Sequence, residues 1–143
     1  MPKLQKSIFV NAPVEKVFEF MSHPQNLPEI WPSFQEVKDV KESPGGGYTY
    51  SWVYKMAGMK FTGTSETTDF KKDQRVGTKN IGGISSNFVW TYATENGGTR
   101  VSVEVEYSIP GALLGKLAEP FITRQNEHEA DAVLANLKAR MEV

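Results

Sequence analysis

The residues best suited to chemistry are Glu129, His128 and His23, because carboxylates and imidazoles are the usual acids, bases and metal ligands. Glu129 is the sharpest catalytic candidate. Inside a partly apolar cavity its pKa would rise, which would make it a usable acid or base. The alternative is a structural pairing of this carboxylate with Arg124, Arg100 or a tyrosine hydroxyl.

The two histidines carry weaker signals. His23 precedes Pro24 between two predicted short helices, where capping a turn is an ordinary role for a polar side chain. His128 lies between Glu127 and Glu129, which suggests a metal ion or a general base. A metal site normally needs three or four converging ligands, and the sequence has no HExxH or paired-histidine spacing. We therefore predict no metal and no cofactor.

Other chemistries are disfavoured by motif and composition. The sequence has no GxSxG elbow, and the glycines at 45–47 are not followed by Lys-Ser/Thr, which excludes a P-loop. Cysteine is absent, which removes thiol nucleophiles, disulfides and zinc–cysteine sites. The net charge is −1, and no long basic run is present, so we expect no nucleic-acid partner.

Length and hydropathy indicate how many domains the protein has and where in the cell it is found. A chain of 143 residues is near the commonest size of one domain, so we expect a single ligand-binding domain over residues 1–143. The N-terminus lacks the apolar run of a signal peptide, and no stretch of 18 apolar residues is present. We expect a soluble, cytoplasmic protein without stable membrane insertion.

Most of the chain alternates between apolar and polar residues, which predicts strands. Short turns separate these strands, so the sheet should be antiparallel, with one face toward water. Asn96-Gly97 is a strong hairpin signal. Two short helices should follow the first strand. The predicted strands span residues 3–10, 34–42, 48–56, 60–70, 76–81, 87–94 and 100–109.

The inward face of this sheet is unusually aromatic. Tyrosine and tryptophan carry polar tips that need partners when buried, whereas a core meant only for packing favours Leu, Ile and Val. Such a face is typical of a ligand cavity, although the rings could instead fill a large core under one helix. The inward residues are predicted to be Tyr50, Trp52, Tyr54, Phe88, Trp90, Tyr92 and Tyr107.

The segment 113–141 is predicted to be the long helix that covers the sheet. Its apolar residues form two sectors, and the second is rotated about the axis relative to the first. A polar middle between them suggests a cavity, or a helix that lifts off the sheet there. Pro120 implies a kink, or a separate turn at 113–117, because proline costs about 3 kcal/mol inside a helix. The polar middle comprises Gln125, His128, Glu129 and Asn136.

Several phrases, in order, resemble the helix-grip superfamily of START-like proteins. This superfamily includes the polyketide cyclase/dehydrase and lipid-transport group, the coenzyme Q-binding proteins and plant pathogenesis-related allergens. The resemblance covers nearly the whole chain. The phrases are NAPVEKVFEF at 11–20, HPQNL at 23–27, WP at 31–32, GGG at 45–47, GTRV at 98–101, Tyr107 and PGALLG at 110–115.

The resemblance implies an α+β fold, in which a curved antiparallel sheet of six to seven strands wraps a long C-terminal helix around a hydrophobic cavity. It also implies that Trp31, Trp52, Trp90, Phe121 and Gln125 face that cavity. No catalytic pattern of the superfamily can be transferred residue by residue, and the fold hosts carriers, cyclases and stress proteins alike.

Three functions follow from these observations. The favoured one is binding or transport of a hydrophobic small molecule: a lipid, an isoprenoid quinone or a polyketide-like ring. An enzyme of the polyketide cyclase/aromatase or dehydratase type could use the same cavity, with Glu129 or a tyrosine as acid or base. A groove for a protein partner is the third. The predicted ligand-binding residues are Trp31, Tyr50, Trp52, Tyr54, Phe88, Trp90, Tyr92, Tyr107, Leu117, Phe121, Gln125 and Glu129.

Overall fold

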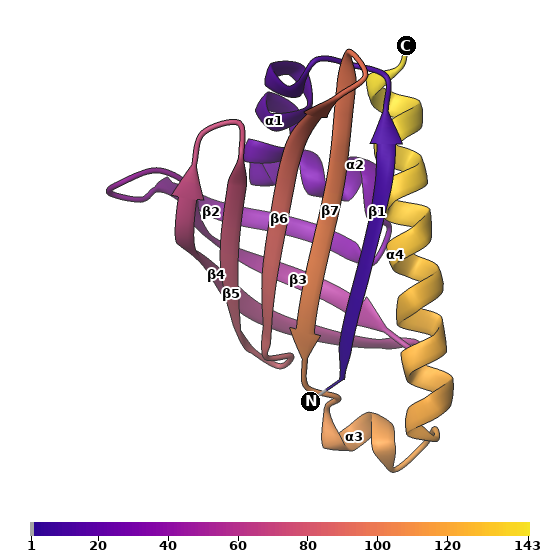
Figure 1. Cartoon of the computed structure of the whole chain (residues 1–143). Helices are drawn as coiled ribbons and strands as arrows, with labels where there is room; N and C mark the ends of the chain where they lie inside the picture. Colours follow the sequence, from indigo (N-terminus) through magenta and orange to yellow (C-terminus); the bar gives the residue numbers. More distant parts are fainter. Residues whose placement is uncertain (1) are drawn as a thin grey trace.

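The structure is a computed structural model that describes residues 2–143 (Figure 1). The strands are β1 (Lys3–Val10), β2 (Phe34–Glu42), β3 (Tyr48–Met56), β4 (Met59–Lys71), β5 (Arg75–Gly82), β6 (Ser86–Glu95) and β7 (Gly98–Tyr107). The helices are α1 (Val14–Ser22), the 3-10 turn η1 (Pro24–Asn26), α2 (Leu27–Ile30), α3 (Gly111–Leu114) and α4 (Glu119–Met141).

The seven strands form one antiparallel sheet in the order β1-β7-β6-β5-β4-β3-β2. Each strand from β2 to β6 pairs with the next one along the chain, and β1 pairs with β7. Alternation decides the faces: Val101, Val103 and Val105 of β7 are buried, whereas the residues between them are more exposed. The predicted α+β helix-grip fold, with its two short helices after the first strand, is confirmed.

The hairpin between β6 and β7 shows how local sequence sets the register. Glu95 pairs with Gly98, which leaves Asn96 and Gly97 as a two-residue turn. Both turn residues have positive φ, 49° and 79°, as a type I′ turn requires. The predicted hairpin is therefore confirmed, although β7 begins at Gly98 and ends at Tyr107 rather than spanning 100–109.

The prediction of one helix over 113–141 was wrong at its start. The chain makes a separate short helix, α3, and α4 begins only at Glu119. Pro120 therefore occupies the first turn of α4, where its missing N–H has no partner to lose. The alternative of a separate turn is correct in kind, although this turn is helical over 111–114 rather than 113–117, and Pro120 lies in the first turn of α4 and not in its interior. No helix in residues 2–143 is long and apolar enough to cross a membrane.

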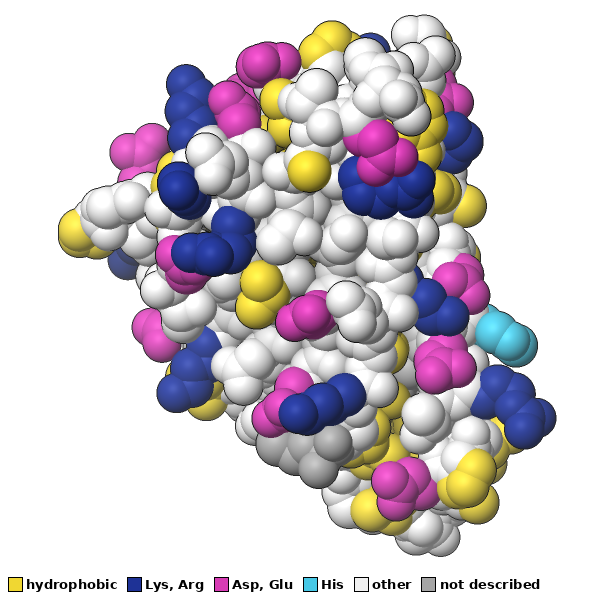
Figure 2. Space-filling model, in the orientation of Figure 1, with side chains coloured by type: hydrophobic (Ala, Val, Ile, Leu, Met, Phe, Trp, Pro, Cys, Tyr) yellow, Lys and Arg dark blue, Asp and Glu magenta, His cyan; other side chains and the backbone are white. Residues whose placement is uncertain are grey.

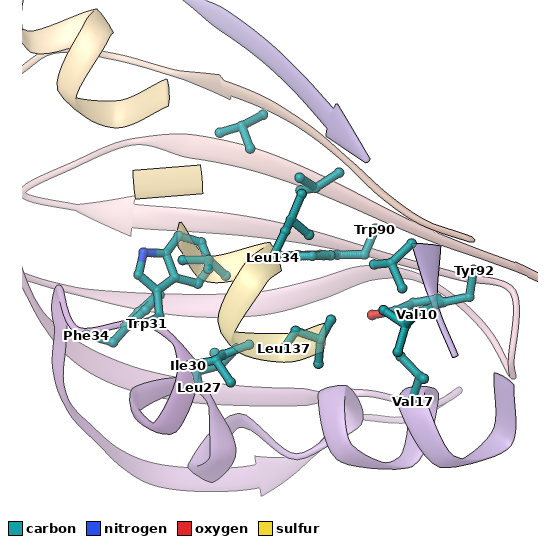
Figure 3. Close-up of a cluster of buried hydrophobic side chains, with 14 of the residues drawn as sticks. Val10, Val17, Leu27, Ile30, Trp31, Phe34, Trp90, Tyr92, Leu134 and Leu137 are labelled. Atoms are coloured by element: carbon teal, nitrogen blue, oxygen red, sulfur yellow. The ribbon is translucent and has the colours of Figure 1, made fainter. Parts of the chain in front are cut away.

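The helices cover the concave face of the sheet from two sides. In Figure 1, α4 runs alongside β1, and α1 and α2 lie behind the strands near the C-terminal end of α4. Val17 and Phe18 of α1 are buried, as are Val133, Leu134 and Leu137 of α4. Figure 3 shows part of this core, with Leu134 and Leu137 between the sheet and α2.

The opposite face of the sheet meets water. On the side shown in Figure 2, positive and negative side chains are interspersed among polar ones. Hydrophobic side chains gather at the lower end of that view, over α3 and the start of α4. Leu114 and Phe121 are about half exposed there, at 48% and 47%.

Candidate functional site: an aromatic cavity under the last helix

A cavity of about 70 Å³ lies between the concave face of the sheet and the first half of α4. The sheet contributes most of the wall, the segment after α2 closes one side, and α4 forms the cover. Its lining residues are Leu4, Trp31, Phe34, Trp52, Tyr54, Met56, Asn80, Ile84, Ser86, Phe88, Trp90, Val103, Val105, Tyr107, Asn126, Glu129, Ala130 and Val133.

Trp31 is the centre of the aromatic wall. It follows α2 directly, and its ring packs edge-to-face against Phe34 at 4.9 Å between centroids. Phe88 lies at 5.5 Å and Trp90 at 6.4 Å from the same ring. Each such pair adds about 0.5–1.5 kcal/mol beyond burial of area, so this wall is held in place by ring-on-ring contacts. Figure 3 shows Trp31 and Phe34 together at one end of the core.

Glu129 of α4 is tied to this wall by two hydrogen bonds. Its Oε1 accepts from Trp31 Nε1–H at 2.6 Å and from the Tyr54 hydroxyl at 2.8 Å. Trp31 Nε1 also lies 3.2 Å from the Tyr54 oxygen. Burial, followed by the nearby charge of Glu129 and its hydrogen bond, raises the pKa of Tyr54 well above its ordinary 10.0. The Tyr54 hydroxyl therefore stays protonated and acts as a donor.

A polar row crosses the sheet beneath the other part of the cavity. The register sets Ser65 opposite Asn80, Asn80 opposite Ser86, and Ser86 opposite Tyr107, so these side chains share one face. Ser65 Oγ donates to Asn80 Oδ1, and Asn80 Nδ2 donates to Ser86 Oγ at 2.8 Å. Tyr50, opposite Ser65, ends the row on the β3 side. Burial raises the pKa of Tyr50, and a hydrogen bond with Ser65 partly offsets this rise.

Gly63 provides the space in which the ring of Trp52 lies against the sheet. Gly63 lies opposite Trp52 in β4, and Gly82 lies opposite Gly63 in β5. A Cβ on Gly63 would stand 2.6 Å from Cη2 of Trp52 and nearer still to its Cζ2. Carbon atoms normally pack at about 3.5–4.0 Å. Only glycine therefore lets this indole lie against the backbone and leave the cavity open.

Three buried polar atoms in the cavity wall have no hydrogen-bond partner. They are Trp52 Nε1, the Tyr107 hydroxyl and Asn126 Nδ2. Buried polar groups are normally paired, and an unpaired one costs about 1–3 kcal/mol. All three belong to residues that line this one cavity. Unpaired groups gathered in one apolar space are typical of a binding site.

Comparison with known proteins places this architecture in a family. Residues 1–142 match the family described as polyketide cyclase/dehydrase and lipid transport. The chain belongs to this family. The sequence has no significant match among curated proteins.

Several solved structures share the fold at low identity. A START superfamily protein from Mycobacterium smegmatis superposes with a TM-score of 0.79 at 12% identity, covering 98% of this chain and 97% of that one. The Zhui aromatase/cyclase from Streptomyces sp. R1128 gives 0.75 at 17% identity, covering 99% and 93%. The di-domain aromatase/cyclase StfQ of the steffimycin biosynthetic pathway gives 0.77 at 15%, covering 98% of this chain and 50% of that one.

The structure brings seven of the twelve predicted ligand-binding residues of this family member to the cavity. Six belong to the aromatic face or the segment after α2, and one to α4; their role as ligand contacts stays a prediction. The seven are Trp31, Trp52, Tyr54, Phe88, Trp90, Tyr107 and Glu129.

The other five lie elsewhere. Tyr92 packs its ring against Phe18 at 5.3 Å, and Figure 3 shows it beside Val10 and Val17, far from Trp31. Tyr50 lies at the β3 end of the polar row, and Leu117 packs on the core between α3 and α4. Phe121 and Gln125 point largely to solvent, so the structure does not place these two at the cavity.

Sequence reasoning missed the polar residues Asn126, Asn80 and Ser86. Asn126 precedes Glu129 by three positions, so both lie on the same face of α4. Asn80 and Ser86 are visible as candidates only once β5 is paired with β6. Their short polar side chains within inward-facing strand positions were the available signal.

The histidines lie outside the cavity. His23 ends α1, with Nε2 3.0 Å from Glu19 Oε1 and Nδ1 3.3 Å from the Tyr48 hydroxyl. His128 is exposed on α4. Among residues 2–143 no group of three or more His, Asp or Glu side chains is arranged to hold a metal ion. Of the pairings considered for Glu129, the tyrosine hydroxyl is the one observed, while Arg100 pairs with Glu95 at 2.9 Å.

Proposed function

We propose that this protein is a cytoplasmic carrier or sensor, with residues 1–143 acting as one domain that binds a hydrophobic small molecule in the cavity under α4. The observation that carries this proposal is the aromatic cavity itself, with Trp31, Trp52 and Trp90 in its wall. A fold built only for stability would fill such a space, because an empty apolar volume forfeits packing energy. Family membership supports the same reading.

The size of the cavity bears on the ligand. Pockets for drug-sized ligands span about 300–1,000 Å³, well above the 70 Å³ that is free here. A lipid, an isoprenoid quinone or a fused polyketide ring therefore needs the cover to open. The structure describes every residue of α4 between Ile122 and Val133, and none of them has a fully buried side chain. Opening of this stretch would expose little apolar surface, but it would have to break the two hydrogen bonds that tie Glu129 to the wall.

Mass spectrometry of organic extracts from the purified protein tests the proposal. A co-purifying lipid, quinone or ring compound is expected, and adding it back should raise the melting temperature. At 100 times Kd a ligand stabilises by about 2.7 kcal/mol, or roughly 5–10 °C for a chain of this size. The proposal fails if nothing is extracted and no member of a lipid, quinone and polycyclic panel shifts the melting temperature.

A matched pair of variants locates the site. Ala130 lines the cavity, whereas Ala132 on the same helix is exposed. Ala130→Phe should fill the space and abolish the ligand-induced shift, and Ala132→Phe should leave the shift intact. Equal binding by both variants would place the ligand somewhere else on the protein.

The second candidate is an enzyme of the cyclase/aromatase or dehydratase type. The observation favouring it is the Glu129 carboxylate, which lies inside the cavity beside the Tyr54 hydroxyl. Structural relatives described as aromatase/cyclases support this reading at the level of fold. Glu129→Gln should then abolish ring closure of a linear poly-β-ketone probe while the protein stays folded. Unchanged turnover in that variant would remove Glu129 from the mechanism.

A further inference from the structure

The cavity wall holds three hydrogen-bond donors for which residues 2–143 supply no acceptor. Trp52 Nε1 can only donate, Asn126 Nδ2 carries two N–H groups, and the Tyr107 hydroxyl can donate one hydrogen. These atoms are fully shielded, so bulk water does not satisfy them in this state. Three uncompensated donors in one small space are a large local cost, which a suitable guest would relieve.

The residues that carry these donors line the cavity from both the sheet and the helix. Tyr107 ends the polar row on β7, next to Ser86 of β6. Trp52 lies over Gly63, which pairs with Gly82, two residues along β5 from Asn80. Tyr107 and Trp52 therefore lie in neighbouring rows of residues on the same face of the sheet. Asn126 approaches from α4, and it lines the same cavity.

Several acceptors nearby already have other donors. Asn80 Oδ1 accepts from Ser65, and Ser86 Oγ accepts from Asn80. Glu129 Oε1 accepts from Trp31 and Tyr54. None of these bonds uses the three unpaired donors, and an acceptor that comes with a ligand would satisfy them. One carbonyl oxygen has two lone pairs, so three donors are matched by a ligand with two acceptor oxygens, or by one carbonyl and a water molecule.

The charged groups of the cavity wall limit the class of ligand further. The cavity wall contains no Lys, Arg or His among residues 2–143, and its one charged group is the Glu129 carboxylate. This carboxylate is one helical turn from Asn126. An anionic ligand would be buried without a counter-charge and beside a like charge, and both are costly. A neutral acceptor meets neither penalty.

We propose that the Trp52, Tyr107 and Asn126 donors form a recognition site for the carbonyl oxygen of a neutral ring compound, and that Glu129 rejects carboxylate ligands such as fatty-acid anions. This assignment rests on the proposed binding function and names the ligand class for the same cavity. Size sets the smallest member: a cavity of about 150 Å³ accepts benzene. The 70 Å³ free here is about half of that, so even a single ring requires wall side chains to move apart.

Three probes of similar size test the class: acetophenone, which is neutral and has a carbonyl; ethylbenzene, which has no acceptor; and benzoate, which is an anion. The chain has only three tryptophans, so its three indole N–H resonances can be assigned with single Trp→Phe variants. Acetophenone should bind at least five-fold more tightly than ethylbenzene and shift the Trp52 N–H resonance downfield. Ethylbenzene should bind without that downfield shift, and benzoate should bind most weakly.

Variants separate recognition from packing. Tyr107→Phe and Asn126→Leu should each weaken acetophenone binding about five-fold, the value of one hydrogen bond, and leave ethylbenzene binding unchanged. Tyr92→Phe is the matched control, because Tyr92 is a buried tyrosine of the same sheet that does not line the cavity. It should change neither affinity. Glu129→Gln should bring the affinity for benzoate closer to that for acetophenone.

The outcomes distinguish the two proposals. If none of the probes and no member of the lipid panel binds, the binding function itself fails. If ethylbenzene binds as tightly as acetophenone, the cavity binds apolar compounds but the donors do not select a carbonyl, and this inference is wrong. Benzoate binding as tightly as acetophenone to the unaltered protein would overturn the role given to Glu129.

Discussion

Gly63→Ala should damage the cavity by moving a ring that the ligand site uses. The new Cβ would stand 2.6 Å from Cη2 of Trp52 and would also clash with the backbone carbonyl of Ile81. The carbonyl is held in the β4–β5 pairing, so the indole is the group free to yield. It must move by about 1 Å or more to restore ordinary contact, and the open side of the ring is the cavity.

Two opposing effects set the change in the free energy of unfolding of Gly63→Ala. Overpacking of this kind costs about 1–3 kcal/mol. Replacing glycine by alanine recovers about 0.5–1 kcal/mol of chain entropy. We expect a net loss of about 1–2 kcal/mol, or a fall in melting temperature of roughly 3–6 °C for this length. Because Trp52 takes up part of the 70 Å³ cavity, ligand binding should weaken more than stability does.

Urea unfolding followed by tryptophan fluorescence measures the stability, and the Trp52 indole N–H resonance reports the ring position. Gly77→Ala is a graded control, because its Cβ would meet only the Thr68 hydroxyl at 3.0 Å and the Asp69 Cβ at 3.2 Å. Gly111→Ala, with nothing within 4 Å, should be neutral or slightly stabilising. If Gly63→Ala keeps the stability, the Trp52 resonance and the ligand affinity of the unaltered protein, the seat described for Trp52 is wrong.

Three further predictions concern the frame around the site. Burial raises the pKa of both Tyr54 and Tyr92 above 10.0, so above that pH the unfolded chain releases protons that the folded chain keeps. The free energy of unfolding should be unaffected by these two groups below pH 10, and above it should fall by about 1.4 kcal/mol per pH unit for each of them. The near-ultraviolet tyrosinate absorbance of these two residues should rise only on unfolding, and tyrosinate signals from both in the folded protein would contradict this. Thr99 is fully buried and donates to the Ala12 carbonyl at 2.8 Å, so Thr99→Val should lose about 1–3 kcal/mol in urea unfolding, and a change below about 0.5 kcal/mol would show that the bond is dispensable. Pro120→Ala should change the melting temperature by less than about 3 °C, because a first-turn proline is tolerated, whereas a large rise would show that Pro120 strains a longer helix.

Most of the fold could be predicted because its signals are local. Strict alternation reports a half-buried strand, and Asn96-Gly97 imposes its own turn, so the predicted strand bounds agree with the structure to within about two residues. The start of the last helix was not predicted, because the local signal there was misleading. Leu114 and Leu117 continue the helical period of the residues after them, and periodicity does not show where the chain breaks. Pro120 did carry that signal, because proline favours a first turn.

The site was harder to predict because a period gives a face and not a position along it. Phe88 and Tyr92 share one face of β6, yet Phe88 lines the cavity and Tyr92 packs under α1. Which of them meets the ligand depends on where the helices cross the sheet. That is a tertiary fact, set by pairings such as Phe18 with Tyr92, and it has no local trace in the sequence.

The polar middle of α4 faces the cavity through Glu129, as expected, but its other cavity residue is Asn126, whereas Gln125, His128 and Asn136 are exposed. Two apolar sectors were expected, whereas the inward residues form one continuous stripe: Ile122, Asn126, Glu129, Ala130, Val133, Leu137 and Met141. Spacings of three and four residues join them, as a single helix face requires. Gln125 precedes this stripe by one position and points to solvent. Residues 113–118, once included in the helix, had shifted the expected face.

The choice between carrier and enzyme depends on Glu129, because the same geometry serves both. Asn126 and Glu129 are three residues apart, so a carbonyl held near Asn126 would lie roughly 4.5 Å along the helix axis from the level of Glu129. A carboxylate at that distance could take a proton from the carbon next to this carbonyl if it were free to approach. Here Trp31 and Tyr54 both donate to its Oε1, and Trp31 is itself fixed by the aromatic wall. Moving Glu129 toward a ligand would break both of these hydrogen bonds, and a buried donor left unpaired costs about 1–3 kcal/mol. This restraint favours a carboxylate that selects neutral ligands and braces Trp31 over one that reacts with them.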